Sequence, residues 1–292
     1  MPTPTVSIIG LPASGKTTFL AALWHLMTGG PGNTSLRLKD LLSGNNEHLN
    51  SLAARWRDAK EQSRTEIGGS RLVSMNLQDA QGRDVQVTFP DVPGEAYRRM
   101  WEDRDCDDDV ADVLRCSGVM LFVHSDTIKA PRWVIDDKAL AEAMAAGLEP
   151  PEGGVEDDPL EWHPGLSPTQ VQLVDLLQLL RRRPLDVGTR KIAIMLSAWD
   201  KAEEDGLSPA EFLKTRLPML YQYLTYGPDG WDLSVYGISA QGGDYDTEEE
   251  DSAPREEAAK LRELDDPTER IRLVSPDSTS TDITVPISWL MS

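Results

Sequence analysis

A short glycine-containing stretch near the start of the chain has the residue types and the spacing that bind phosphate. It reads Gly10-x-x-x-x-Gly15-Lys16-Thr17. The two glycines allow backbone conformations in which several N–H groups point at one anion. A helix that begins at Lys16 would add the positive end of its dipole at the same place. Lys16 is therefore expected to reach the β- and γ-phosphates of a nucleotide, and the Thr17 hydroxyl to coordinate Mg²⁺.

The flanking residues indicate the strand and the helix that must hold this loop. Val6, Ile8 and Ile9 form an apolar run of strand character before it. Apolar residues with helical spacing follow it at Phe19, Leu20, Leu23, Trp24 and Met27. The motif binds nucleotides in this order of strand, loop and helix, whereas a glycine-rich turn that binds nothing does not require it. The predicted nucleotide contacts in this unit are Gly10, Ala13, Ser14, Gly15, Lys16, Thr17 and Thr18.

Length and cysteine content limit the kind of protein that this chain can be. Its 292 residues suffice for one large α/β domain with insertions or for two small domains. Residues 1–4 show no secretory signal, and no apolar run is long enough to span a bilayer. We therefore expect a cytoplasmic protein without a membrane anchor, with reduced thiols at Cys106 and Cys116. Neither cysteine has a nearby histidine, which speaks against a zinc site.

The charge balance bears on the partner. With 29 basic and 49 acidic residues, the chain has a formal net charge of −20. Such a surface repels the phosphates of nucleic acids and anionic membranes. We expect no nucleic-acid partner and favour a protein partner with a basic face, although an acidic surface is also simply well solvated.

The order of apolar patterns predicts an α/β fold of the P-loop NTPase class, with a mostly parallel sheet, one antiparallel edge strand and helices on both faces. Alternating residues at 70–78 and 85–89 predict a hairpin. Continuous apolar runs predict parallel strands that are buried on both faces. Those runs are 118–123, 191–196 and 233–238, and the predicted helices after the first are 47–62, 110–115, 136–146, 168–182 and 209–224.

Composition also predicts how the chain is divided. One P-loop domain is expected over residues 1–242, with a surface insertion at 126–167. Residues 243–270 are rich in Asp and Glu and nearly free of aromatic residues, which is typical of a segment that is mobile or only partly helical. The apolar islands within 271–292 are expected to pack back onto the domain.

Further polar residues follow predicted strands, where the ligand of a parallel sheet binds. Asp91 can hold Mg²⁺ through water and Gly94 can bond the γ-phosphate, although a D-x-x-G turn also ends ordinary strands. The carboxylate of Asp200 can accept hydrogen bonds from both N1–H and the exocyclic amine of guanine, which adenine does not offer. A helix N-cap is the other interpretation of Asp200. The backbone of Ser239 and Ala240 can contact guanine O6, or can form a plain strand-to-loop turn.

In this order and on these elements, the motifs resemble those of the Ras-like (TRAFAC-type) P-loop GTPases. The phrases FPDVPGE, SAWD and VPISWL are further similar to the bacterial double-GTPase family, and the resemblance spans residues 5–292. It implies a Mg²⁺-dependent switch that binds GTP and GDP, hydrolyses GTP and acts on a protein partner. Members of the double-GTPase family are associated with multi-gene assemblies in conflict with phage or rival cells, and the resemblance implies such an assembly here.

The resemblance also implies residue roles. Lys16, Thr65 and Glu95 are the implied catalytic residues, and Thr17, Thr65 and Asp91 are the implied metal ligands. Thr65 corresponds to the switch I threonine, which also helps to orient the attacking water, while an ordinary surface threonine is the alternative. Asp200 is the implied reader of guanine, with Lys201 beside it.

Two positions depart from the family pattern. Ala198 stands where a base-stacking lysine is expected, with Trp199 nearby, so guanine preference depends on Asp200. Glu95 stands where the catalytic glutamine is expected. A glutamate accepts a hydrogen bond from water but donates none, and its charge opposes the γ-phosphate, so hydrolysis is expected to be slow. An arginine in cis could assist at Arg64, Arg98 or Arg99, which otherwise serve as ordinary ion-pair partners.

Three functions therefore compete. In a GTP switch, the γ-phosphate would order segments 63–69 and 91–109 and release them after hydrolysis. A P-loop ATPase or kinase-type enzyme would share the phosphate loop without reading guanine. A nucleotide-stabilised scaffold with negligible turnover is the third, and Glu95 makes it plausible.

Overall fold

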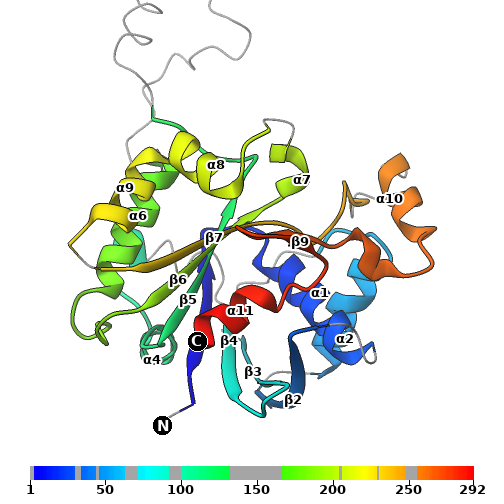
Figure 1. The fold of residues 1–292 in the computed structure, drawn as a ribbon, viewed down its shortest axis with the longest axis horizontal. Coiled ribbons are helices and arrows are strands. Elements are labelled where there is room, and N and C mark those ends of the chain that lie inside the picture. The colour runs from blue at the N-terminus through cyan, green and yellow to red at the C-terminus, as the bar shows by residue number, and fades with distance from the viewer. Residues whose placement is uncertain are drawn as a thin grey trace, which may run out of the picture.

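A nine-stranded mixed sheet forms the centre of the molecule (Figure 1). The computed structural model describes residues 3–29, 34–43, 46–62, 71–91, 100–131, 166–203, 206–228, 230–247 and 255–292. The strands lie in the order β2-β3-β4-β1-β5-β6-β7-β8-β9. They are β1 (Thr5–Gly10), β2 (Leu36–Ser43), β3 (Arg71–Asp79), β4 (Asp84–Asp91), β5 (Gly118–His124), β6 (Lys191–Ser197), β7 (Asp232–Ser239), β8 (Arg272–Val274) and β9 (Thr279–Ser280).

The five central strands, β4, β1, β5, β6 and β7, run parallel, and antiparallel pairing occurs on both sides of them. β3 is antiparallel to β2 and β4, and β8 is antiparallel to β7 and β9. The α/β class is confirmed, but the prediction of one antiparallel edge strand is wrong. The register of β2 shifts between Leu38 and Asp40 and again between Leu41 and Ser43, which breaks the alternation that marks a strand. β8 and β9 are too short to show any periodicity in the sequence.

The central strands are buried on both faces, as their continuous apolar runs predict. In β5, Met120 and Phe122 belong to one hydrophobic cluster, while Val119, Leu121 and Val123 belong to the other. Successive side chains of a strand point to opposite faces, so one run of apolar residues serves both cores. The strand is therefore fixed in register by packing from both sides.

The helices divide between the two faces of the sheet (Figure 1). One face is covered by α1 (Lys16–Thr28), α2 (Asn46–Arg57), α10 (Glu256–Arg262) and α11 (Val285–Met291), whose buried side chains share one core. The other is covered by α4 (Asp108–Leu114), α6 (Thr169–Leu180), α7 (Trp199–Ala202), α8 (Pro209–Arg216) and α9 (Pro218–Tyr226). Among the described residues, no helix is both long enough and apolar enough to cross a membrane.

The single helix predicted over 209–224 is two helices. Pro218 begins α9 directly after Leu217, whose backbone angles (φ −133°, ψ 55°) are not helical. Proline has no N–H to donate and disfavours the helical conformation of the residue before it, so α8 ends there. The predicted helix 136–146 and the greater part of the predicted insertion 126–167 lie outside the described residues.

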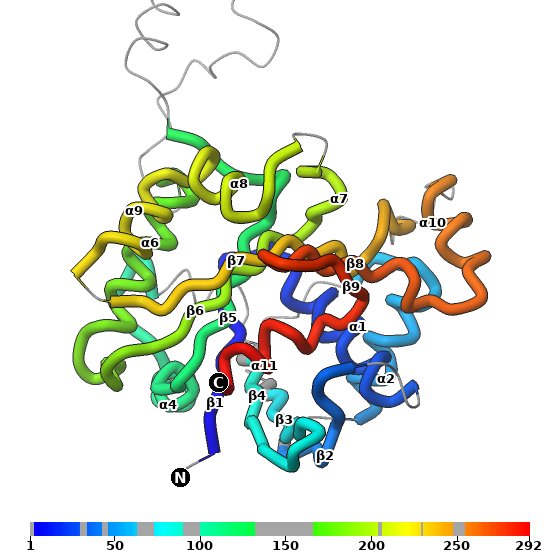
Figure 2. The backbone as a smooth tube through the Cα atoms, in the orientation of Figure 1, coloured from blue at the N-terminus to red at the C-terminus, as the bar shows by residue number. Residues whose placement is uncertain are grey.

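The acidic region 243–270 is partly helical where the structure describes it. Residues 255–270 contain α10 and a 3-10 helix, η3 (Pro267–Arg270), and Ala258, Leu261 and Arg270 are buried. Sparse apolar residues at helical spacing suffice to dock α10, while the acidic residues between them face water. Figure 2 shows the chain continuing from there across the sheet to α11. Leu290 of α11 is buried close to Gly118, at the amino end of β5.

One carboxylate joins this last segment to the start of β2. Asp282 accepts hydrogen bonds from the N–H and hydroxyl of Ser35, each at 2.7 Å, and from the N–H and hydroxyl of Thr284 at 2.9 and 2.6 Å. The Thr284 hydroxyl in turn accepts a bond from Leu36 N–H at 3.2 Å. The closing segment is thus held at the far edge of the sheet.

We expect Asp282→Ala to lower the free energy of unfolding by about 2–3 kcal/mol, because it removes the acceptor of the buried Thr284 donors and of Ser35. Urea denaturation measures the change. Asp277→Ala, which removes an exposed carboxylate near the β8–β9 turn, is the control and is expected to change stability by less than about 0.5 kcal/mol. Equal effects of the two substitutions would contradict this role of Asp282.

Candidate nucleotide-binding site

The loop between β1 and α1 can form only with glycine at two positions. Gly10 (φ 153°) passes so close to β5 that a Cβ there would lie 2.6 Å from the carbonyl oxygen of Phe122. Gly15 (φ 87°) precedes α1, and a Cβ there would lie 3.0 Å from the side chain of Ser197. The predicted need for glycine at both positions is confirmed, and its reason is as much close packing as backbone freedom.

The side chain of Lys16 folds back onto the loop that precedes it. Its ammonium group donates to the carbonyl oxygens of Gly10 and Leu11, each at 2.8 Å, and to the hydroxyl of Ser14 at 3.1 Å. These acceptors lie at the start and in the middle of the loop, so Lys16 closes it into a ring. A phosphate in this place would offer the ammonium group charged acceptors, which make stronger hydrogen bonds than neutral carbonyls.

The tips of the parallel strands bring the other predicted residues to the same edge of the sheet. β1 pairs with β4 from Thr5 and Gln86 to Ser7 and Thr88, and β4 ends at Asp91. β6 ends at Ser197, next to Asp200, and β7 ends at Ser239. The side chain of Asp91 and the predicted residues Thr65, Gly94, Glu95, Arg64, Arg98 and Arg99 lie outside what the structure describes.

Hydrogen bonds join the loop to the tips of β5 and β6. The hydroxyl of Ser197 donates to the carbonyl oxygen of Ser14 at 2.9 Å. Ser125 N–H donates to the carbonyl oxygen of Ser197 at 3.0 Å, and the Ser125 hydroxyl donates to that of Ala198 at 2.9 Å. The phosphate-binding loop and the Ser197–Asp200 motif are therefore parts of one hydrogen-bonded unit.

Trp199 is a core residue and not a candidate for stacking on a base. Its side chain is 2% exposed and packs edge-on against Phe212, with ring centroids 5.5 Å apart. A Cβ on Gly237 of β7 would lie 2.4 Å from the indole, so the strand admits this side chain only because residue 237 is glycine. Ala198 adopts a left-handed conformation (φ 51°, ψ 43°), which turns the chain so that Trp199 is buried while Asp200 and Lys201 stay exposed.

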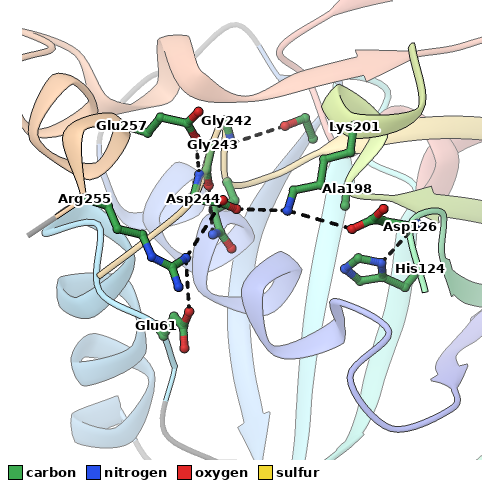
Figure 3. Close-up of polar contacts among 12 residues, drawn as sticks. Glu61, His124, Asp126, Ala198, Lys201, Gly242, Gly243, Asp244, Arg255 and Glu257 are labelled. Atoms are coloured by element: carbon green, nitrogen blue, oxygen red, sulfur yellow. Dashed lines mark hydrogen bonds and ion pairs between the residues drawn. The ribbon is translucent and has the colours of Figure 1, made fainter. Parts of the chain in front are cut away.

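Lys201 lies between two carboxylates from different elements (Figure 3). Its ammonium nitrogen is 3.0 Å from a carboxylate oxygen of Asp244 and 3.9 Å from one of Asp126. The hydrogen bond that the Lys201 ammonium group donates to Asp244 raises the pKa of Lys201 above its ordinary value. Lys201 thus ties the turn after β6 to the loops after β5 and β7.

His124 ends β5 within the same group, and burial of its ring favours the neutral form. Burial of the ring, opposed by the charges of Asp126 and Asp200, holds its pKa below the ordinary value. Its Nδ1 accepts the N–H of Asp126 at 3.3 Å, so the proton is on Nε2 (Figure 3). Sequence reasoning missed His124, Ser125 and Asp126, although they follow a parallel strand directly, which is the criterion that found Asp91 and Asp200.

The loop after β7 is held by α10 and by the segment after α2 (Figure 3). Gly242 N–H donates to the hydroxyl of Ser239 at 3.2 Å, and Asp244 N–H donates to the carboxylate of Glu257 at 2.7 Å. The guanidinium of Arg255 lies 3.6 Å from Glu61 and 4.0 Å from Asp244. These contacts fix the backbone that follows Ser239 and Ala240.

This site has the features that define the class of P-loop NTPases. A glycine-dependent loop with an inward-folded lysine joins a strand to a helix, at the carboxyl edge of a parallel sheet.

The available donors also suit Mg²⁺. Thr17 carries a hydroxyl in the first turn of α1, and β4, which ends at Asp91, is the neighbour of β1 in the sheet. Oxygen donors of these two kinds are those that Mg²⁺ prefers.

The chain belongs to the Double-GTPase 1 family, whose model it matches over residues 7–290. The resemblance to the double-GTPase family found from the motifs is thereby confirmed, and the chain is a domain of a GTP-binding GTPase family. No relative is found among curated proteins.

The chain is also similar to solved structures of GTP-binding proteins. One, of the signal recognition particle receptor SRb-GTP/SRX complex from Chaetomium thermophilum, has 14% identity and a TM-score of 0.38, over 82% of this chain and 92% of that one. A putative nucleolar GTP-binding protein 1 from Plasmodium falciparum has 10% identity and a TM-score of 0.37, over 82% and 79%. The Ski7 GTPase-like domain of S. cerevisiae, bound to GTP, has 11% identity and a TM-score of 0.40, over 82% and 43%. Similarities of this size do not indicate a shared activity.

We expect Ser197→Ala to lower the free energy of unfolding by about 1 kcal/mol and to weaken GTP binding several-fold, because the loop loses its hydrogen bond to β6. Denaturant unfolding and calorimetric titration measure the two effects. Ser7→Ala is the matched control, since the Ser7 hydroxyl is buried in the same sheet without a hydrogen-bond partner among the described residues. If both variants bind GTP as the unaltered protein does, Ser197 does not support the loop.

Proposed function

We propose that this protein is a Mg²⁺-dependent molecular switch that binds GTP and hydrolyses it slowly. The hydrogen bond from Ser197 to Ser14 is the observation that carries the proposal, since it couples the phosphate-binding loop to the turn that presents Asp200. A nucleotide that fills the loop with its phosphates would then reach the Asp200 carboxylate with its base. In this proposal, the phosphate-binding loop and Asp200 contact opposite ends of the same nucleotide.

Guanine recognition falls to two elements in this proposal. The exposed carboxylate of Asp200 accepts N1–H and the exocyclic amine of the base. The N–H of Ala240, just after β7, donates to O6. Lys201 is held by Asp244 and Asp126 and lines the same side of the site. Ala198 carries no side chain that could stack on the base, so discrimination depends on these edge contacts.

Thr17, Asp91 and Thr65 are proposed to hold Mg²⁺, which would neutralise the charge of the β- and γ-phosphates when bound. Lys16 exchanges its bonds to Gly10 and Leu11 for phosphate oxygens. The bound ion and the γ-phosphate would order segments 63–69 and 91–109, and loss of the γ-phosphate would release them.

In the hydrolysis step, the oxygen of a water molecule bonds to the γ-phosphorus while the bond from that phosphorus to the β–γ bridging oxygen breaks. The products are GDP and inorganic phosphate, which keeps one water proton on the incoming oxygen and takes the other on a former γ-phosphate oxygen. Glu95 accepts a hydrogen bond from the attacking water but donates none to the transition state, so turnover is slow until an arginine assists. Arg64, Arg98 or Arg99 could supply it in cis, or a partner in trans.

The partner is proposed to be a protein with a basic face, because the chain carries a net charge of −20. We further propose a cytoplasmic setting and, by the family resemblance, a role in a bacterial conflict or defence assembly. An ATPase or kinase-type enzyme is the alternative if guanine is not preferred. Glu95 favours a second alternative, a nucleotide-stabilised scaffold that turns over negligibly.

We expect Asp200→Asn to lower the affinity for GDP by about tenfold or more and to favour the xanthine nucleotide XDP over GDP. An amide accepts one hydrogen bond and donates one, which matches N1–H and the C2 carbonyl of xanthine but not the two donors of guanine. Calorimetric titration with GDP, XDP and ADP measures the change.

Lys16→Ala is the control, and it is expected to lose its affinity for nucleoside triphosphates whichever base they carry. Equal affinity of the unaltered protein for GTP and ATP would end the guanine proposal and favour the ATPase alternative.

Glu95→Gln is expected to raise single-turnover hydrolysis about tenfold at unchanged GTP affinity, since one added donor in the transition state is worth about 1.4 kcal/mol. Release of γ-phosphate from a pre-formed complex measures the rate. If neither the variant nor the unaltered protein releases phosphate faster than buffer, the scaffold alternative is favoured.

A further inference from the structure

The loop proposed to contact guanine is anchored to a tryptophan far away in the chain. The indole N–H of Trp56 donates to the carbonyl oxygen of Ala240 at 2.7 Å, across 184 residues of sequence. Trp56 lies near the end of α2 and is fully buried. A buried indole N–H requires an acceptor, and here the acceptor is the backbone directly after β7.

Trp56 has no freedom to turn away from this acceptor. The ring of His25 in α1 lies against it with centroids 5.1 Å apart, and the guanidinium of Arg270 lies 4.8 Å from the centre of the Trp56 ring. Arg270 also donates to the carbonyl oxygen of Trp56 at 2.8 Å. Elements from three parts of the chain therefore hold the indole in one orientation.

The rest of the loop is fastened to the same region. Asp246 N–H donates to the carbonyl oxygen of Ala59 at 3.0 Å, and Glu61 N–H donates to that of Asp246 at 2.9 Å. Gly242 lies so close to Arg270 that a Cβ there would be 2.7 Å from the Arg270 Cβ. The end of α2 and η3 thus form a rigid support for residues 240–246.

Ala240 is fixed on both sides by these contacts. Ser239, the residue before it, is paired with Arg272 in β8. The carbonyl oxygen of Ala240 itself accepts the hydrogen bond from Trp56. We propose that Trp56 is a positioning residue for guanine recognition: by holding the carbonyl of Ala240, it keeps the Ala240 N–H directed at guanine O6. This inference rests on the proposed function, in which that N–H contacts the base.

Because Trp56 fixes the loop after β7, it is expected to affect discrimination between guanine and adenine. Where guanine presents the O6 acceptor, adenine presents an amine, which would meet the Ala240 N–H donor to donor. A loose loop could rotate to avoid that contact, whereas a fixed one keeps the penalty against adenine. Trp56 is therefore expected to affect guanine and adenine nucleotides unequally, which a purely structural residue would not do.

Trp56→Phe tests the proposal, since it removes the N–H and keeps most of the packing. We expect GDP affinity to fall about five- to tenfold and ADP affinity to change less than about twofold, as measured by calorimetric titration of the full chain. Trp24→Phe is the matched control. Trp24 is 5% exposed in the same core and donates its indole N–H to Asn50 at 2.8 Å, away from the base loop.

The ratio of GDP to ADP affinity decides the outcome. A fall in this ratio for Trp56→Phe but not for Trp24→Phe supports the proposal. An unchanged ratio in Trp56→Phe overturns the role of Trp56 and leaves the proposed function intact. Equal binding of GDP and ADP by the unaltered protein would remove guanine recognition, and the role of Trp56 with it.

A measurement on the unaltered protein covers the case in which Trp56→Phe does not fold. Coupling is reciprocal, so a base that depends on Ala240 must stabilise the Trp56 hydrogen bond in return. We expect GDP to slow hydrogen exchange of the Trp56 indole proton more than ADP does. For the indole proton of Trp24, we expect GDP and ADP to have equal effects. Equal slowing by GDP and ADP at Trp56 would overturn the proposal.

Discussion

The close approach of the phosphate-binding loop to the tips of β5 and β6 is the constraint on which the rest of the site depends. Gly10 lies so close to the Phe122 carbonyl that no side chain would fit there, and Gly15 is tightly packed against the side chain of Ser197. The loop is therefore packed against the central strands before any ligand arrives. Preorganisation of this kind spares a binding site the entropy of ordering a loop.

The base side of the site is supported from both faces of the sheet by a buried tryptophan. Trp199 belongs to the core on one face and carries the exposed Asp200 next to it, while Trp56 belongs to the core on the other face and holds Ala240. Each depends on close packing with a distant partner, Gly237 for Trp199 and Arg270 for Trp56. The two halves of the proposed guanine site are thus extensions of the two hydrophobic cores.

The cationic side chains near the site have partners within the protein. The cationic side chains around the loop after β7 are engaged in ion pairs, Lys201 with Asp244 and Arg255 with Glu61. Lys16 is bonded to the phosphate-binding loop itself. The cationic side chains near the site are thus already engaged within the protein.

The sequence by itself determined the phosphate-binding loop, the parallel strands and the placement of Asp91 and Asp200 at strand tips, because each depends on a local pattern of spacing or apolar runs. It also predicted roles for Thr65 and Glu95, which stay predictions. Only the tertiary structure decided the outer strands, since the shifts in β2 erase its alternation and β8 is too short to show one. The docking of α10, the burial of Trp199 and the bond from Trp56 to Ala240 were likewise decided there. Those contacts join residues far apart in the chain, and no local pattern encodes which distant backbone a buried side chain will meet.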